Sequence, residues 1–290
     1  MPRAKGWKER GIKDGFGHIQ ILKWPEFINY VCQEMPNYPT YVWRGHRCDN
    51  WSLESTLDRL IRESKIPKTK KPGFRNSHLE RFKFSVQGRR GPNPPPIEDE
   101  NDWWALGQHH GLKTPLLDWT TSPFAAAYFA FIGTGKDQTK YRAIYALHRP
   151  SVEKKVNKLV GREIVRREAK REDLEKSPKR KNALAVALSE KPIRPEVEFI
   201  RPRSDENLRL VSQTGLFTRA PNGTTLEEWV QKNFAGESDS YTLMELLVPN
   251  EDREDCLRIL NRMNINHLTL FPDLYGASKF CNLFSEIENY

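Results

Sequence analysis

The stretch from Gln108 to Phe131 constrains the fold more than any other part of the chain, because it joins a polar segment, a short apolar strand and an apolar helix. Ser122 followed by Pro123 predicts a helix N-cap and a first helical position, since serine accepts a backbone N–H and proline has none to leave unpaired. The next residues are alanine and aromatic on all sides, which is typical of a buried helix. The pattern therefore predicts a strand ending at Asp118, a polar turn, and a helix N-terminus able to hold an anion.

The composition favours a soluble protein with polyanionic partners. The chain has 290 residues, and Lys and Arg outnumber Asp and Glu by 47 to 38, which gives a net charge of +9. This charge favours RNA, DNA or an acidic protein as partner. The four cysteines show no metal-ligand or CxxC spacing, so we expect no metal. No apolar run is long enough to span a bilayer, and we expect a cytoplasmic protein without a membrane segment, of unassigned oligomeric state.

Strand and helix patterns interleave irregularly, which predicts an α+β fold with helices packed on a mixed or split sheet. Residues 1–20 show little periodicity and indicate an irregular lead-in, so we separate residues 1–36, an N-terminal arm and helix, from a domain of residues 37–290. Residues 151–192 are rich in Lys, Arg and Glu and predict a charged helical insertion. Residues 151–182 are either a solvated face or an arm that binds a polyanion or a partner protein.

Capping residues and apolar spacing predict several local boundaries. The expected features are a helix capped at Asn76 or Ser77, one capped at Asn101-Asp102, one capped at Thr224, a strand-like run from Asn207 that breaks at Gly215, a strand over 241–248, and a last helix that docks Leu274, Ala277, Phe280, Phe284 and Ile287 on the core.

Two groups of polar residues are candidates for chemistry. The short strand before Arg44-Gly45 delivers an arginine suited to bidentate phosphate binding, and the glycine allows close approach of a backbone. His109, His110 and Asp118 form the second group and could act as acid, base or ligand of a nuclease. A structural alternative remains open, in which Arg44 and Asp118 only neutralise each other at the ends of neighbouring strands.

The sequence closely resembles the FRG domain, named after a Phe-Arg-Gly signature. The resemblance runs from about Tyr41 to Phe284, with Trp43 in place of the signature Phe and Pro115 where the family commonly has Arg. The matching residues are Trp43-Arg44-Gly45, the run from Gln108 to Thr120, Pro123, Ala126, Tyr128-Phe129-Ala130, Asn207, Arg209, Gln213, Gly215-Leu216-Phe217 and the run from Leu270 to Gly276.

A more distant similarity to mono-ADP-ribosyltransferases implies NAD as substrate and an ADP-ribosyltransferase-like fold. In those enzymes one strand ends in Arg-Gly, a second leads into a Ser/Thr-rich turn and an Ala-x-x-Phe-Ala helix, and a later strand supplies Glu or Gln. Arg44-Gly45, Thr120-Thr121-Ser122 and residues 127–130 resemble the first two elements.

This similarity implies a role for each candidate residue. Arg44 would hold the pyrophosphate, and the turn hydroxyls would orient the ribose. Gln213 or Glu245 would take the place of the transferase Glu, with His109 as a supporting candidate. The full set of residues expected at the NAD site is Arg44, Gly45, Asp118, Trp119, Thr120, Thr121, Ser122 and Tyr128.

We therefore expect an NAD-dependent ADP-ribosyltransferase-like protein, a toxin or antiviral-defence effector that modifies nucleic acid or protein. Two alternatives stay open. One is a non-catalytic module that binds nucleic acid or a partner protein, and the other is a nuclease that uses His109 and His110.

Overall fold

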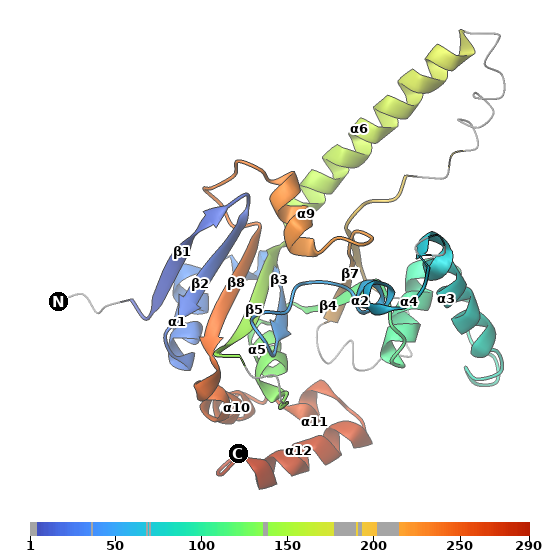
Figure 1. The fold of residues 1–290 in the computed structure, drawn as a ribbon. Coiled ribbons are helices and arrows are strands. Elements are labelled where there is room, and N and C mark those ends of the chain that lie inside the picture. The colour runs from blue at the N-terminus through green and yellow to red at the C-terminus, as the bar shows by residue number, and fades with distance from the viewer. Residues whose placement is uncertain are drawn as a thin grey trace.

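The computed structural model shows a chain folded around one mixed sheet (Figure 1). The structure describes residues 5–35, 37–67, 69, 71–135, 139–176, 190, 193–201 and 215–290. Within these ranges eight strands lie in the order β1-β2-β8-β5-β3-β4-β7-β6. Strands β2 and β8 run parallel and the other neighbours antiparallel. The strands are β1 (Trp7–Lys13), β2 (Phe16–Ile21), β3 (Tyr41–His46), β4 (Leu116–Thr120), β5 (Tyr141–His148), β6 (Glu198–Ile200), β7 (Gly215–Arg219) and β8 (Leu243–Pro249).

Helices pack on both faces of this sheet, which confirms the α+β class. They are α1 (Trp24–Glu34), α2 (Thr56–Glu63), α3 (Lys71–Ser85), α4 (Glu100–His109), α5 (Pro123–Ile132), α6 (Arg149–Glu175), α9 (Leu226–Asn233), α10 (Arg253–Arg262), α11 (His267–Leu270) and α12 (Leu274–Glu286), with short 3₁₀ helices at Tyr38–Thr40 and Asn250–Asp252.

One face of the sheet is covered by α1, α5 and the three C-terminal helices α10–α12. Trp43 of β3 and Ile144 of β5 point into this layer and are fully buried. Helix α5 is capped by Ser122, whose side chain accepts the Ala125 N–H, and Pro123 is its first residue. Its alanines are buried against the sheet, so the predicted buried helix is confirmed.

The other face is covered by α9 and the first turns of α6. Val152 and Val156 of α6 pack on Leu147 and Leu243, and the rest of α6 projects away from the body of the protein (Figure 1). Helices α2, α3 and α4 form a third group beside β4 and β7. In the parts of the chain that the structure describes, no helix has both the length and the apolar character needed to cross a membrane.

The expectation of an irregular lead-in over residues 1–20 is wrong for residues 7–21. These residues form the β1–β2 hairpin at one edge of the sheet. Asp14 and Gly15 both have positive φ, as a two-residue turn of the type that joins antiparallel strands requires. The Asp-Gly pair is the signal that the periodicity argument overlooked.

Several predicted boundaries move by a few residues, because the capping residue differs from the one expected. Helix α3 begins at Lys71 rather than after Asn76 or Ser77, and α4 is capped by Asp99 rather than by Asn101-Asp102. Other shifts are that β4 ends at Thr120 rather than Asp118, that Thr225 rather than Thr224 caps α9, and that β8 begins at Leu243. Residues 207–214 of the strand-like run expected before Gly215 lie outside the described residues, and β7 is described from Gly215 to Arg219.

The predicted docking face of the last helix is partly wrong. Ile287 is buried, but Leu274 is 87% exposed and Phe284 is 54% exposed. Leu283 and Gly276 are the buried positions of α12 instead. Only glycine fits at position 276, because its Cα lies against the backbone of Phe271 and leaves no room for a side chain.

The charged insertion is helical over α6, as predicted. The remainder of the predicted insertion, residues 177–189 and 191–192, lies outside the described residues. Beyond this gap, Glu198–Ile200 forms β6.

Helix α5 approaches β3 closely at Gly45. A Cβ on Gly45 would overlap the carbonyl oxygen of Ala126 and lie 2.6 Å from the amide nitrogen of Ala130. Both are backbone atoms of α5, so neither can swing aside. The glycine after Arg44 is therefore required by helix–strand packing.

We expect Gly45→Ala to lower the free energy of unfolding by about 1–3 kcal/mol or more, because overpacking against a helix backbone forces the helix to move. Urea unfolding followed by tryptophan fluorescence measures this. Gly73→Ala is the control: nothing lies within 4 Å of its added Cβ, and the position is helical. It should be neutral or stabilising by up to about 1 kcal/mol. Equal destabilisation by both variants would contradict the packing argument.

Candidate functional site

A cleft opens around Arg44, at the point where β3, β4, α5 and the end of α11 meet. Its smaller part, which we call the aromatic chamber, has a volume of about 320 Å³. It is lined by Trp43, Arg44, Gly45, Asp118, Trp119, Thr120, Phe129 and Phe271.

A second chamber of about 500 Å³ shares Arg44, Gly45, Asp118 and Phe129 with the first. It adds Arg47, Arg59 and Lys113, and we call it the cationic chamber. The two chambers together are the Arg44 cleft, with Arg44 at their junction.

Three hydrogen bonds and ion-pair contacts fix the Arg44 guanidinium in this junction. Its Nε lies 2.9 Å from His46 Nε2, and its Nη1 donates to the Asp118 carbonyl oxygen at 2.8 Å. The same Nη1 lies 3.4 Å from the Asp118 carboxylate. Arg44 and His46 are two residues apart in β3, so both side chains lie on the same face.

His46 must be neutral to hold Arg44 in this way. Burial and the nearby Arg44 charge lower the pKa of His46 from 6.5 to about 3. Its Nε2 then accepts the Arg44 Nε–H, and its Nδ1–H donates to the Trp51 carbonyl oxygen at 3.2 Å. The arginine is thus oriented by a buried neutral imidazole.

Asp118 is positioned by the polar segment that opens the central motif. Gln108 Nε2 donates to Asp118 Oδ1 at 2.6 Å, and the Thr114 hydroxyl donates to Gln108 Oε1. The Thr114 N–H in turn donates to the Thr56 hydroxyl at 3.1 Å, which ties the motif to α2. The run from Gln108 to Asp118 therefore places one carboxylate beside Arg44.

Arg44 and Asp118 differ strongly in exposure. The Asp118 side chain is 61% exposed, whereas that of Arg44 is 21% exposed. An ion pair with an exposed partner stabilises a protein by about 0–1 kcal/mol. The alternative in which the two residues serve only to neutralise each other in the interior is therefore not supported, because the carboxylate faces solvent.

Of the Ser/Thr turn at residues 120–122, only Thr120 lines the aromatic chamber. Thr120 lines the aromatic chamber but accepts the Ser122 N–H at 3.1 Å. Ser122 uses its side chain to cap the Ala125 N–H, and its carbonyl accepts the Ala126 N–H. Thr121 and Ser122 are absent from the chamber lining. Helix α5 is thus capped at the Ala125 N–H, and the anion site expected at its N-terminus stays a prediction.

The two aromatic residues predicted at the site, Trp119 and Tyr128, lie in different surroundings. Trp119 lines the aromatic chamber, with its Nε1–H donating to Thr218 at 2.8 Å. Tyr128 has no exposed surface, and its hydroxyl lies 2.5 Å from His267 Nδ1. Tyr128 is therefore a core residue, and Phe129 and Phe271 supply the aromatic wall in its place.

Glu245 is buried in the sheet rather than in the cleft. It lies in one cross-strand row with Tyr145 and His18, two strands away from Arg44. The Tyr145 hydroxyl donates to Glu245 Oε1 at 2.8 Å, and His18 Nδ1 lies 2.6 Å from Oε2. Burial and the Glu245 charge raise the pKa of Tyr145, so its hydroxyl stays a donor.

The remaining candidates do not meet in the cleft. Gln213, with Asn207 and Arg209, lies outside the described residues. His109 and His110 end α4, with their rings 4.8 Å apart, and line neither chamber. Within the described ranges no three His, Cys, Asp or Glu side chains are grouped to hold a metal ion.

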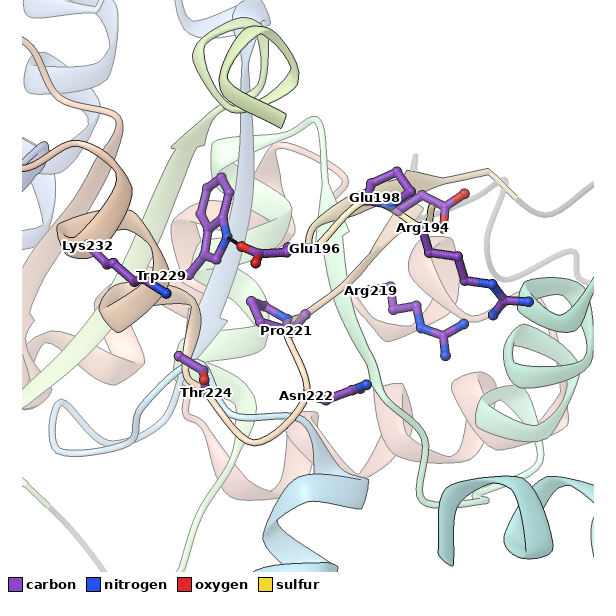
Figure 2. Close-up of a pocket in the computed structure, with 11 residues that line it drawn as sticks. Arg194, Glu196, Glu198, Arg219, Pro221, Asn222, Thr224, Trp229 and Lys232 are labelled. Carbon is purple, nitrogen blue, oxygen red and sulfur yellow. Dashed lines mark hydrogen bonds between the residues drawn. The ribbon is translucent and has the colours of Figure 1, made fainter. Parts of the chain in front are cut away.

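A separate pocket of about 390 Å³ lies between β6, β7 and α9 (Figure 2). Its charged groups are already engaged. Glu196 accepts the Trp229 Nε1–H at 2.7 Å, and Arg194 and Arg219 each lie 3.0 Å from Glu100. Burial opposes the ionisation of Glu100, but these arginines outweigh it and lower the Glu100 pKa. The Arg44 cleft is the stronger candidate because two of its lining cations, Arg47 and Lys113, have no ion-pair partner among the described residues.

The sequence model of the FRG domain family matches residues 39–142. This range contains Arg44, Gln108 and Asp118 and most of the cleft lining. Residues 39–142 are therefore similar to an FRG domain, and they supply all of the cleft lining except Phe271. Searches of the curated proteins and of the solved structures gave no match.

The cleft also contains residues that the sequence did not single out. His46 could have been found from the period of two in β3, which places it beside Arg44. Phe271 lies far along the chain, and nothing in the sequence shows that it folds back to α5, where the centres of the Phe129 and Phe271 rings are 6.1 Å apart.

The low pKa of His46 predicts a pH dependence of stability. The unfolded chain takes up a proton at His46 below pH 6.5, whereas the folded chain does so only near pH 3, so stability falls as the pH falls between these values. We expect His46 to contribute a loss of about 2 kcal/mol between pH 7 and pH 5. Urea unfolding at both pH values measures it.

His46→Gln is the comparison, because glutamine cannot titrate. The variant should lose about 2 kcal/mol less than the native chain over the same pH interval. An equal loss in both proteins, or an NMR titration that shows His46 protonated at pH 5, would contradict a neutral His46.

Proposed function

We propose that the Arg44 cleft binds NAD and that the protein is an ADP-ribosyltransferase-like enzyme. One observation carries the proposal: Arg44 is held by His46 and by the Asp118 backbone, while its Nη2 has no partner among the described residues. A guanidinium fixed in this way presents one edge to the cleft. Such an edge matches the oxygens of a pyrophosphate.

The shape of the cleft fits a ligand with an aromatic end and a charged middle. Phe129 and Phe271 line the aromatic chamber and supply a surface for the nicotinamide ring. Arg44 lies at the junction with the cationic chamber, and the pyrophosphate, which is linked to the nicotinamide through a ribose, would lie there. Each chamber lies within the range of about 300–1,000 Å³ that is typical of small-molecule sites.

Asp118 supplies the charge that the reaction needs. In ADP-ribosyl transfer the bond between ribose C1′ and the nicotinamide nitrogen breaks, and the acceptor forms a bond to C1′. The ribose becomes positively charged in the transition state, and a nearby carboxylate stabilises this charge. Among the described residues that line the aromatic chamber, Asp118 is the only carboxylate. This role replaces the one that we expected for Glu245.

We expect Arg44→Ala to weaken NAD binding by about tenfold to a hundredfold, because the charge-assisted hydrogen bonds from the guanidinium to phosphate are removed. Calorimetry measures the binding, and release of nicotinamide in the presence of cellular RNA, DNA and protein measures the reaction. Arg81→Ala is the matched control, since Arg81 lies exposed on α3, outside the cleft.

Asp118→Asn separates binding from reaction in the same assay. It keeps the shape and should leave NAD affinity nearly unchanged while slowing nicotinamide release by about a hundredfold or more. No binding of NAD by the native chain, or binding unaffected by Arg44→Ala, would refute the proposed function. A biological role as a toxin or antiviral-defence effector, and the nucleic acid or protein acceptor, remain predictions.

A second candidate function, polyanion binding, is favoured by α6. This helix carries nine Lys and Arg against six Asp and Glu and projects from the body (Figure 1). Lys154, Lys158 and Arg162 are exposed and spaced four residues apart, so they lie along one side of the helix. Among the described residues none of the three has an ion-pair partner. Such a row can follow the phosphates of a nucleic acid.

We expect replacement of Lys154, Lys158 and Arg162 by Gln to weaken binding of duplex DNA and to reduce the slope of log K against log salt by about 0.9 for each phosphate that the protein no longer neutralises. Fluorescence anisotropy over a salt series measures both. Lys8→Gln with Lys13→Gln, exposed on β1, is the control. An unchanged slope would show that the α6 row is only a solvated face.

A further inference from the structure

The cationic chamber contains more positive charge than a pyrophosphate requires. Arg44 lies at its junction with the aromatic chamber, and Arg47, Arg59 and Lys113 add three cations beyond it. The described carboxylates of the lining are Glu54 and Asp118.

Both carboxylates are already engaged. Glu54 accepts two hydrogen bonds from Arg62, at 3.1 and 3.0 Å, and lies only at 3.8 Å from Arg59. Asp118 accepts from Gln108 and contacts Arg44. The ammonium of Lys113 has no ion-pair partner among the described residues. The chamber thus retains positive charge that the protein does not neutralise.

Arg47 is held in a fixed position in this chamber. Its guanidinium lies 5.0 Å from the centre of the Trp51 ring, and its Nη1 donates to the Thr134 carbonyl at 3.0 Å. Gly133 and Gly135 lie directly against its side chain, where a Cβ would be crowded. Its Nε is buried and has no hydrogen-bond partner in the part of the chain that the structure describes. Ordering an arginine in advance reduces the entropy cost when an anion binds.

Arg59 lies close enough to the same centre to act electrostatically on it. Its charge contributes, with that of Arg44, to the lowered pKa of His46. The four cations Arg44, Arg47, Arg59 and Lys113 therefore line one cavity rather than lying scattered over the surface. A second anionic group beyond the pyrophosphate would meet them directly.

We propose that the ligand of the Arg44 cleft carries a phosphate monoester on its adenosine half, so that the preferred substrate is a 2′-phosphorylated dinucleotide of the NADP class rather than NAD itself. This inference rests on the proposed function. The pyrophosphate contacts Arg44, and the adenosine half extends into the cationic chamber. A phosphate monoester carries about −1.5 to −2 charges at neutral pH, which matches the unneutralised cations there.

The test compares binding of NAD and NADP to the full chain by calorimetry. We expect NADP to bind about tenfold to a hundredfold more tightly than NAD, through added charge-assisted contacts. Lys113→Ala and Arg59→Ala should each reduce NADP affinity about tenfold and change NAD affinity less than about twofold. Lys8→Ala, at an exposed position of β1 outside the cleft, is the matched control, and thermal unfolding confirms that each variant folds.

The outcomes distinguish this inference from the proposed function. Equal affinity for NAD and NADP, with both weakened by Arg44→Ala, overturns the inference and leaves the proposed function standing. A preference for NADP that survives both Lys113→Ala and Arg59→Ala also overturns it, because the phosphate then binds elsewhere. Failure of both dinucleotides to bind overturns the proposed function and the inference together.

Discussion

The hydrogen bond from Arg44 to a neutral His46 is the interaction on which the cleft depends. A charged imidazole would repel the guanidinium and could not accept its Nε–H, so the burial that lowers the His46 pKa also fixes the arginine. Successive side chains of β3 point to opposite faces of the sheet, so Arg44 and His46 lie on one face and Gly45 on the other. The two polar side chains lie on one face, and the glycine on the other face lets α5 approach closely. That approach brings Phe129 to the wall of the aromatic chamber.

A row of polar residues continues from Arg44 across the centre of the sheet. Arg44, Tyr145, Glu245 and His18 are opposite one another on β3, β5, β8 and β2. The Tyr145 hydroxyl and the His46 ring both lie 3.2 Å from the Trp51 carbonyl oxygen, which joins the row to the cleft. Buried polar groups are costly unless all are hydrogen-bonded, and a satisfied row fixes the strand register. Glu245 therefore acts in the sheet as a positioning residue, even though its type and its strand suggested a catalytic one.

The sequence predicted what depends on neighbours along the chain. The Ser122 cap and the burial of α5 follow from local spacing, and both are observed. The strand that carries Arg44 was also predicted, but it continues past Arg44 to His46. The β1–β2 hairpin was also local, but the argument from periodicity overlooked its Asp14-Gly15 turn. The position of Glu245 depends on strand order, since β8 pairs with β5 and β2 rather than with β3. The exposure of Leu274 and Phe284 depends likewise on how α12 docks, which an apolar pattern does not determine.

The exposure of Asp118 decides between a structural and a functional role for the central motif. A pair built for stability would bury both partners and satisfy them completely. Here hydrogen bonds link three residues of the motif in the order Thr114, Gln108 and Asp118. The last of them, Asp118, nevertheless has a carboxylate that faces solvent at the junction of the two chambers. Exposed pairs contribute little to folding, so this ordering is not explained by stability. Under the proposed function, a ligand would meet one fixed cation and one fixed anion together at this junction. Rigid placement of both lowers the cost of binding and of charge development alike.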